Sequence, residues 1–406
     1  MRVCIDSCLL GTDRHIVCDD ARFVWTSTVP PDSWHLTGTV KPGHSRCLDT
    51  LLRLGQVAID INPPERFVKA TVPLLSGSNW SSHPPWHRMM PDAAYRDFVK
   101  TLVARAVEAV PSLPVNYYND TWVPGNEVLG SLHRARIDRS QWQAAVDSGA
   151  GNLHALATFE PDRHGFAGQV SYNRFGTLTG RMTVASGPNI LTLKKEQRGI
   201  IAPSTTGGRI MAIDFAALEP RILLYEAGRR CDEPDLYSHI AREVGDAPRQ
   251  VVKGIVICEL YGSSRHALAV RLNMGSKELD RYMARVRSYF NTSELLERIR
   301  AQFLSSGHIV NRYGRHVLID EPLNHVMLNY YAQSTGVDVA LLGFRQVIAR
   351  LVESAPSVRP IFLLHDGLFL DVPADDVDVV KAINSVSVPG YVQKFHLTVS
   401  DVNVHA

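Results

Sequence analysis

The sequence predicts an α+β fold, and three observations support this prediction. From about residue 150 to the end, short apolar runs typical of strands are mixed with stretches of helical periodicity. Residues 1–75 contain short strand-like runs with turn residues between them. Residues 91–110 begin with helix start signals, Pro91 and Asp92, and continue with apolar residues at helical spacing. We therefore expect a β-rich beginning, then a helix, then a larger mixed region.

The composition is that of an ordinary globular protein. The 406 residues leave room for two or three domains, with 45% hydrophobic and 21% charged residues. A formal net charge of +2 gives no global basicity, although a local basic channel remains compatible with balanced totals. No apolar run approaches the roughly 20 residues that a membrane span needs, and the first residues lack a signal-peptide pattern. We expect a cytoplasmic location and no membrane partner.

The first 90 residues are expected to form a small β-rich region of unknown role. Its expected strands are residues 2–6, 15–20, 22–29 and 56–61. Segment 76–92 is rich in Ser, Pro and Trp, which indicates a linker or an ordered loop at a domain boundary.

Four of the six cysteines lie in the first fifty residues, namely Cys4, Cys8, Cys18 and Cys47. Their spacing fits no common zinc-ligand pattern. We interpret them as reduced, half-buried thiols, as in most cytosolic chains, and a structural zinc site is the alternative interpretation.

An apolar run ends on a carboxylate in the middle of the chain. Residues 210–213 are apolar and precede Asp214, and Glu219 and Arg221 follow before the apolar run resumes. A buried charge is costly unless a partner or a metal ion compensates it. Asp214 is therefore either the cap of the following helix or a metal ligand.

A second apolar run is broken in a similar way. Residues 361–364 are apolar, His365 and Asp366 interrupt them, and residues 368–370 resume the run. Gly367 suits a tight hairpin turn. Two strands that each deliver an aspartate can place both carboxylates side by side, where divalent cations would relieve their repulsion. Two unrelated turn aspartates are the alternative.

A predicted helix presents basic groups and an aromatic ring in order. Arg249, Lys253, Ile257 and Tyr261 follow at steps of four, so they spiral along one broad helix face. The cations suit a triphosphate, and the apolar and aromatic groups suit a base. A surface helix covered by another domain is the alternative.

Together these stretches resemble the A-family DNA polymerases, of the bacterial DNA polymerase I type. DFAALEPR (214–221) looks like the family's first metal-binding motif, RQVVKGIVICELYG (249–262) like its fingers helix, and HDG (365–367) like its second metal-binding motif. TLTGRMTVASGPNIL (177–191) is similar to the T-x-T-G-R segment that reaches the primer–template minor groove, and NYYAQSTGVDVAL (329–341) resembles the N-x-x-x-Q-G-T-x-A-D helix. Five matches in the family's order are highly specific, and they cover roughly residues 153–372.

The resemblance implies a site for two-metal nucleotidyl transfer. Two Mg²⁺ ions, with Mn²⁺ as a candidate substitute, would be held by Asp214, Asp366 and the carbonyl of Phe215. The implied catalytic residues are Asp214, Asp366, Lys253 and Arg249. The implied nucleotide-binding residues are Glu219, Arg249, Lys253, Ile257, Tyr261 and Tyr237. The implied DNA-binding residues are Arg181, Asn189, Asn329, Gln333 and His365.

Several of these roles are specific. By the resemblance, Glu219 is the steric gate that blocks a ribose 2′-hydroxyl, and Tyr261 lies by the templating base. Arg181, Asn329 and Gln333 would bond minor-groove acceptors that every base pair presents. The implied partners are primer–template DNA and dNTPs, with a processivity or replisome protein as a further candidate. The implied setting is the cytoplasm of a bacterial or phage-infected cell.

The implied architecture is a right-hand polymerase fold. Residues 1–90 would form the β-rich N-terminal region, 91–150 a reduced helical thumb, and 222–320 the helical fingers. The palm, an antiparallel sheet, would be built from residues 151–221 and 321–406.

Some positions depart from the family pattern. Gly367 stands where the second metal motif usually has Glu, and Ile257 replaces the aromatic that stacks on the incoming sugar. Tyr237 occupies the place of a phosphate-contacting His, with His239 two residues on. Ser334 replaces the usual Gly of the Q-G-T segment.

Three hypotheses about function follow. A DNA-templated DNA polymerase without proofreading is the preferred hypothesis. Proofreading is not expected because the D-x-E of the family's exonuclease occurs nowhere in the sequence. An RNA-synthesising relative, similar to single-subunit RNA polymerases, is the second; Glu219 and the T-x-T-G-R segment argue against it. A catalytically silent nucleic-acid-binding scaffold is the third, and the retained aspartates and cations argue against it.

Overall fold

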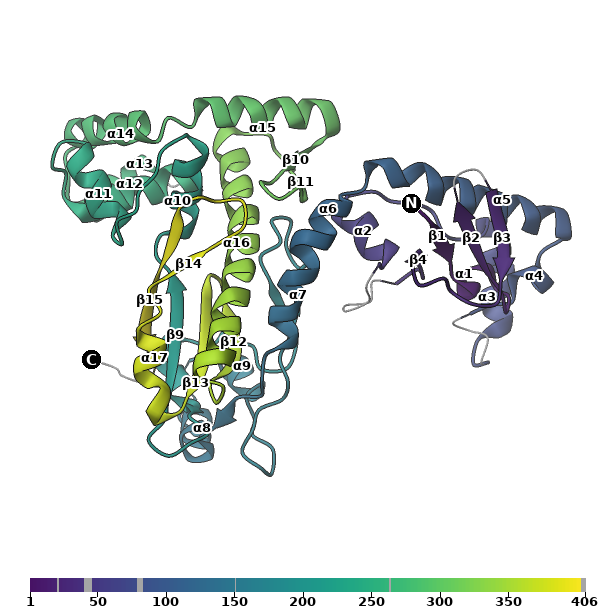
Figure 1. The fold of residues 1–406 in the computed structure, drawn as a ribbon, viewed down its shortest axis with the longest axis horizontal. Helices are drawn as coiled ribbons and strands as arrows, with labels where there is room; N and C mark the ends of the chain where they lie inside the picture. Colours follow the sequence, from purple (N-terminus) through teal and green to yellow (C-terminus); the bar gives the residue numbers. More distant parts are fainter. Residues whose placement is uncertain (20–21, 40–45, 79–82, 150, 263, 403–406) are drawn as a thin grey trace. The chain divides into compact units, whose positions relative to one another are not determined.

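The computed structural model describes residues 1–406 apart from 20–21, 40–45, 79–82, 150, 263 and 403–406. The chain divides into two compact units (Figure 1). The first contains Met1–Val123 and Gly314–His316, and the second contains Pro124–Tyr313 and Val317–Ala406. The assignment of residue ranges to a thumb, a palm and fingers stays a prediction.

The first unit contains a four-stranded sheet in the order β3-β2-β1-β4. Its strands are β1 (Val3–Ile5), β2 (His15–Asp19), β3 (Arg22–Thr26) and β4 (Trp34–Leu36). Strand β1 is antiparallel to β2 and parallel to β4. Its helices are α1 (Ser7–Leu10), α2 (Leu48–Leu54), α3 (Glu65–Leu75), α4 (Trp86–Met89), α5 (Asp92–Ala109) and α6 (Val115–Tyr117).

The first unit confirms most of the expected elements and corrects one. The strands expected at 2–6, 15–20 and 22–29 are formed, and α5 is the helix expected from Pro91 and Asp92. The strand expected at 56–61 is wrong, because these residues follow α2 as irregular chain. A segment with an alternating pattern forms a strand only when it pairs with a neighbouring strand. Segment 56–61 pairs with none of the described strands. The expected linker at 76–92 includes α4, and its residues 79–82 lie outside the described part.

The second unit is built on a five-stranded sheet in the order β12-β13-β9-β15-β14. Its strands are β9 (Arg209–Phe215), β12 (Arg359–Leu364), β13 (Gly367–Val372), β14 (Ser385–Ser387) and β15 (Lys394–Asp401), and every pairing between them is antiparallel. Shorter strands are β5 (Arg136–Ile137), β6 (Ser171–Asn173), β7 (Thr183–Ser186), β8 (Ile201–Ala202), β10 (His308–Val310) and β11 (His316–Leu318). The central strand β9 carries the run Ile210–Ile213, which is buried as expected.

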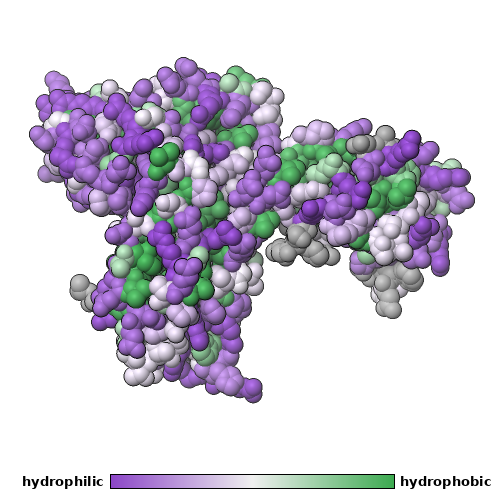
Figure 2. Space-filling view, in the orientation of Figure 1, coloured by the Kyte–Doolittle hydropathy of each residue, from purple (hydrophilic) through white to green (hydrophobic). Residues whose placement is uncertain are grey.

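Helices surround this sheet and extend beyond one end of it (Figure 1). They are α7 (Val123–Gly130), α8 (Arg139–Asp147), α9 (Leu153–Ala157), α10 (Leu218–Glu226), α11 (Leu236–Glu243), α12 (Arg249–Tyr261), α13 (Arg265–Leu272), α14 (Ser276–Phe290), α15 (Ser293–Ser306), α16 (Asn324–Ser354) and α17 (Val377–Lys381). On the face shown in Figure 2, the helices α11–α14 present mostly hydrophilic side chains, as expected for amphipathic helices around a core.

Two hydrophobic cores share the long helix α16. The core of the sheet includes Ile213, Phe344 and Leu368, and the core of the helices α11–α15 includes Val252 and Ile299. Helix α16 supplies its first turns to the second core and its later turns to the first core. Among the described helices, none combines the length and the apolar character that a membrane crossing needs.

Candidate active site

The two predicted metal-binding aspartates lie next to each other on the sheet. Asp214 is near the end of β9, and Asp366 is in the turn between β12 and β13. The register of β9 and β13 pairs Asp214 with Gly367, the residue that follows Asp366. The backbone N–H of Phe215 also donates a hydrogen bond to the carbonyl of Asp366, at 3.2 Å. Two apolar strands therefore deliver two carboxylates to one place, as the sequence predicts.

Gly367 has a different role from the one expected. It is the first residue of β13 and not a turn residue, and the turn consists of His365 and Asp366, with His365 at a left-handed φ of 57°. A Cβ atom added at Gly367 would lie 2.3 Å from Oδ1 of Asp214. The position needs glycine because the carboxylate of Asp214 occupies the space that a side chain would fill.

Burial raises the pKa of both carboxyl groups. Burial raises the pKa of Asp214 to about 6, with a further contribution from the charge of Asp366 and a smaller opposing effect of Arg198. Burial also raises the pKa of Asp366. Buried carboxylates that repel each other favour binding of a cation, which relieves both costs.

Arg221 explains why a second charge follows so closely in this apolar region. The residue is 1% exposed, and its side chain donates to backbone carbonyls: Nε to Ala216 at 2.8 Å, Nη1 to Cys231 at 2.9 Å, and Nη2 to Glu233 and Pro234. These bonds hold the segment after Asp214 against the chain that leads into α11. Arg221 is therefore a structural group, and Glu219 has other partners.

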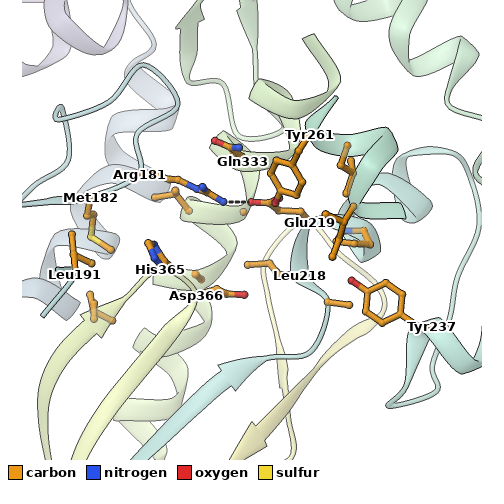
Figure 3. A pocket seen from close by; sticks show the side chains of 18 residues that line it. Arg181, Met182, Leu191, Leu218, Glu219, Tyr237, Tyr261, Gln333, His365 and Asp366 are labelled. Atoms are coloured by element: carbon orange, nitrogen blue, oxygen red, sulfur yellow. Dashed lines mark hydrogen bonds and ion pairs between the residues drawn. The ribbon is translucent and has the colours of Figure 1, made fainter. Parts of the chain in front are cut away.

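A cavity of about 320 Å³ adjoins Asp366 (Figure 3), whereas Asp214 is not among the residues that line it. Asp366 and His365 line it from the hairpin, and helix α16 contributes Gln333. The other walls come from the β6–β7 region and its continuation, from the start of α10, and from α11 and α12; they include Arg181, Met182, Leu191, Glu219, Tyr237, Ile257 and Tyr261. Eight of the residues predicted for the site thus meet at one cavity.

Glu219 joins two sides of this cavity. Its Oε1 accepts a hydrogen bond from Nη2 of Arg181 at 2.9 Å, and its Oε2 accepts one from the hydroxyl of Tyr261. Figure 3 shows Arg181 reaching toward Glu219, with the ring of Tyr261 beside the same carboxylate. Burial, followed by the charge of Glu219, holds the pKa of Tyr261 well above its usual value, so the phenol stays protonated and donates.

The two cations of α12 both lie near the aromatic ring of Tyr237. The guanidinium carbon of Arg249 lies 5.7 Å, and Nζ of Lys253 5.9 Å, from the ring centroid of Tyr237. Nε of Arg249 also donates to Oδ2 of Asp235 at 2.6 Å. Tyr237 lines the cavity, while Arg249 and Lys253 do not.

His239 is not placed to replace Tyr237. Its Nδ1 lies 2.8 Å from Oε1 of Glu233, its Nε2 lies 3.0 Å from the hydroxyl of Tyr289, and it does not line the cavity.

The predicted DNA-binding residues are only partly gathered at the cavity. Arg181, Gln333 and His365 line it. Asn329 lies one turn before Gln333 on α16 and accepts a hydrogen bond from its Nε2 at 2.5 Å. Asn189 does not line the cavity, and its Oδ1 is buried without a hydrogen bond to any described residue. Burial, and then the charge of Arg181, lower the pKa of His365, which favours a neutral imidazole.

A family model described as DNA polymerase family A matches residues 161–400, more than half of the chain. The chain belongs to DNA polymerase family A.

Individual members of family A share modest identity with this chain. DNA polymerase I of Pseudomonas aeruginosa is 27% identical over 247 residues, covering 52% of this chain and 26% of that protein. DNA polymerase I of Bacillus caldotenax is 24% identical over 240 residues, covering 51% and 27%. The DNA polymerase of Mycobacterium phage L5 is 26% identical over 183 residues, covering 43% and 30%. The aligned part is thus less than a third of each relative.

A solved structure confirms the fold expected for family A. The polymerase domain of Pol1 from M. smegmatis, in complex with a DNA primer–template and a dNTP, matches with a TM-score of 0.53 and 13% identity. The match covers 98% of this chain and 94% of that one. The predicted right-hand polymerase fold, with its antiparallel palm sheet, is therefore confirmed.

Sequence reasoning missed two groups of this family A site. Asp235 caps α11 and also binds Arg249, and Arg198 acts on the charge of Asp214. An Asp before a helix signals an N-cap, but it does not reveal an ion pair with a residue fourteen positions later. No local pattern marks Arg198, whose effect depends on the fold alone.

Proposed function

We propose that this family A chain is a DNA-directed DNA polymerase that extends a primer 3′-hydroxyl with dNTPs and has no 3′→5′ proofreading activity. The observation that carries the proposal is the adjacency of Asp214 and Asp366 on neighbouring strands, with Asp366 lining a cavity that Glu219 and Tyr261 border. The relatives named DNA polymerase, and the neighbour solved with primer–template and dNTP, support the same reaction class.

The carboxylate pair fits divalent metal ions. Both groups are held close together, burial raises the pKa of both, and Gly367 leaves room for the carboxylate of Asp214. We propose that Asp214, Asp366 and the carbonyl of Phe215 hold two Mg²⁺ ions, with Mn²⁺ as a candidate substitute. When bound, such ions lower the pKa of a hydroxyl nucleophile and neutralise phosphate charge.

The remaining residues bind and orient the two substrates. In the proposed reaction the primer 3′ oxygen bonds to the α-phosphorus of the dNTP, the bond from that phosphorus to the bridging oxygen breaks, and pyrophosphate leaves. Arg249 and Lys253 bind the triphosphate, and the ring of Tyr237 lies 5.7 Å and 5.9 Å from their charged groups. Burial raises the pKa of Tyr237 to about 12, so its hydroxyl remains a neutral hydrogen-bond donor.

The primer–template contacts come from the opposite side of the cavity. Arg181 and Gln333, with Asn329 behind Gln333, contact minor-groove acceptors that do not depend on sequence. His365 contacts the primer terminus, and Asn189 belongs to the same strand-binding segment. Ile257 holds the incoming sugar by apolar contact. A processivity protein and a cytoplasmic location in a bacterial or phage-infected cell are part of the same proposal.

Primer extension tests the proposal. The purified chain, a primer–template and dNTPs are combined with Mg²⁺ or with a chelator, and NTPs replace dNTPs in parallel reactions. We expect incorporation of dNTPs that depends on Mg²⁺. Asp214→Ala and Asp366→Ala should each abolish this incorporation, while primer–template binding persists. Extension with NTPs in preference to dNTPs would favour the RNA-synthesising alternative, and binding without incorporation would favour the scaffold.

The absence of proofreading has its own test. The Asp214→Ala variant is incubated with Mg²⁺ and a primer that ends in a mismatch. We expect the primer to keep its length, because the sequence has no D-x-E. Metal-dependent shortening of the primer by this variant would show a nuclease site and would contradict the proposal.

A further inference from the structure

A cluster of metal-ligating side chains lies in the first compact unit, apart from the polymerase site. The thiol of Cys4 and one ring nitrogen each of His15 and His35 all lie within 4.8 Å of one another. It is the only group of three or more His, Cys, Asp or Glu residues with this spacing among the described residues. A carboxylate adjoins it, because Oδ2 of Asp6 lies 3.3 Å from Nε2 of His35 and 4.0 Å from Nδ1 of His15.

The strand register places these side chains on one face of the sheet. Cys4 on β1 pairs with His35 on the parallel strand β4. Asp6 lies two residues after Cys4, so its side chain points to the same face. The antiparallel register of β1 and β2 pairs Ile5 with Ile16, and one further step brings Asp6 opposite His15. The backbone therefore fixes the convergence, independently of the side-chain rotamers.

The four side chains of this cluster differ in burial. Cys4 is fully buried, while the side chains of Asp6, His15 and His35 are 17%, 16% and 21% exposed. An ion would thus have a buried thiol beneath it and a route from solvent above it. Nε2 of His35 is itself buried and lacks a hydrogen bond of good geometry within the described part, despite its closeness to Asp6.

We propose that Cys4, His15, His35 and Asp6 form a structural zinc site that joins β1, β2 and β4. One thiolate, two imidazoles and one carboxylate are a donor set that zinc accepts. Tetrahedral zinc needs donor atoms roughly 3.3–3.8 Å apart, given bond lengths of about 2.0–2.3 Å, so the donors contract by about 1 Å on binding. Nδ1 of His15 then exchanges its hydrogen bond from the N–H of Ser7, at 3.1 Å, for the metal.

The competing interpretation is a metal-free ion pair between His35 and Asp6. Such a pair needs neither the thiol of Cys4 nor the imidazole of His15, and it gives the protein no affinity for zinc. Zinc binding and its dependence on Cys4 and His15 therefore separate the two interpretations.

Metal analysis of the full chain is the first test. The protein is treated with a chelator, loaded with a small excess of Zn²⁺, desalted, and analysed for metal by mass spectrometry. We expect about one zinc per chain in the wild type, and less than about 0.2 in His15→Gln, His35→Gln and Cys4→Ser. His87→Gln in the same unit and Cys231→Ser in the other unit are matched controls that should keep one zinc. A wild-type content below about 0.2, or full content in the His15→Gln/His35→Gln double variant, overturns the proposal.

Cobalt substitution and unfolding of the unmutated chain complete the test without relying on the folding of variants. Co²⁺ bound at this site should give the near-ultraviolet charge-transfer band of a thiolate ligand, and Cys4→Ser should lose that band specifically. Zn²⁺ added to the chelated wild type should raise Tm by several degrees, whereas Mg²⁺ at the same concentration should not. No thiolate band and no zinc-dependent shift in Tm would leave the ion pair as the correct interpretation.

Discussion

The hydroxyl of Tyr261 donates a hydrogen bond to Oε2 of Glu219, and this bond links the last turn of α12 to the first turn of α10 across the cavity. Arg181 holds the other carboxylate oxygen at 2.9 Å. Both carboxylate oxygens of Glu219 thus accept a hydrogen bond, and the side chain is only 13% exposed. These two hydrogen bonds restrict rotation of the Glu219 side chain, so it forms a rigid wall of the cavity.

Glu219→Ala should weaken the exclusion of ribonucleotides. Removal of the wall leaves space for a 2′-hydroxyl, so we expect kcat/KM for NTPs relative to dNTPs to rise at least about tenfold. The total rate should fall, because Arg181 and Tyr261 lose their common partner. The measurement is kcat/KM for both substrates on both proteins. Glu219→Gln, which keeps the bulk, should retain most of the selectivity, and an unchanged ratio in Glu219→Ala would refute the gate assignment.

Gly367→Ala should damage catalysis without unfolding the protein. The new Cβ would lie 2.3 Å from Oδ1 of Asp214, so the carboxylate must turn away from its position. We expect the extension rate to fall by about tenfold or more and the Mg²⁺ concentration for half-maximal rate to rise. Gly130→Ala is the control, because a Cβ there meets no atom within 4 Å. Equal metal dependence in Gly367→Ala and wild type would contradict the close approach.

Asp214→Asn should stabilise the metal-free protein at neutral and alkaline pH. The folded pKa of Asp214, about 6, lies above the usual value of 3.8, so the folded state binds more protons in this window and wild-type stability falls as pH rises through it. The variant has no carboxyl group at this position, so it avoids this loss of stability. We expect its Tm in chelator to exceed the wild-type value by a few degrees above pH 7, and the gap to vanish near pH 4. Equal Tm values for Asp214→Asn and the wild type in chelator above pH 7 would contradict this prediction.

Asp235→Asn should tighten dNTP binding. Asp235 holds Arg249 in a partly exposed ion pair, whereas an Asn retains the N-cap of α11. Exposed pairs of this kind contribute up to about 1 kcal/mol, so release of Arg249 should lower KM for dNTPs about twofold to fivefold. Glu233→Gln, which affects Arg242 and His239 instead, is the control. A KM that rises in Asp235→Asn would mean that the ion pair positions Arg249 for the triphosphate.

The adjacency of Asp214 and Asp366 could be predicted from the sequence because its pattern is local, whereas their catalytic role stays a prediction. Asp214 and Asp366 each interrupt or end an apolar run long enough for one buried strand, and a charge in such a run needs a functional explanation. The spacing of Arg249, Lys253, Ile257 and Tyr261 likewise predicts one helix face, and α12 spans these residues.

The features that sequence reasoning missed depend on contacts between distant segments. Glycine favours turns, so the sequence predicts Gly367 in the hairpin turn, yet cross-strand pairing with Asp214 decides its role. The bond between Asp235 and Arg249 joins two helices, and the cluster around Cys4 arises from three strands. None of these follows from spacing along the chain.

Helix α16 limits how the parts of this family A chain can be exchanged between relatives. Met327 and Tyr331 pack into the core of the helices α11–α15, whereas Val339 and Phe344 pack into the core of the sheet. A chimaera that takes only residues 222–320 from a relative would bring foreign helices against the original side chains of α16. Recombination would preserve both cores only if the crossover fell inside this helix, between Ala332 and Val339.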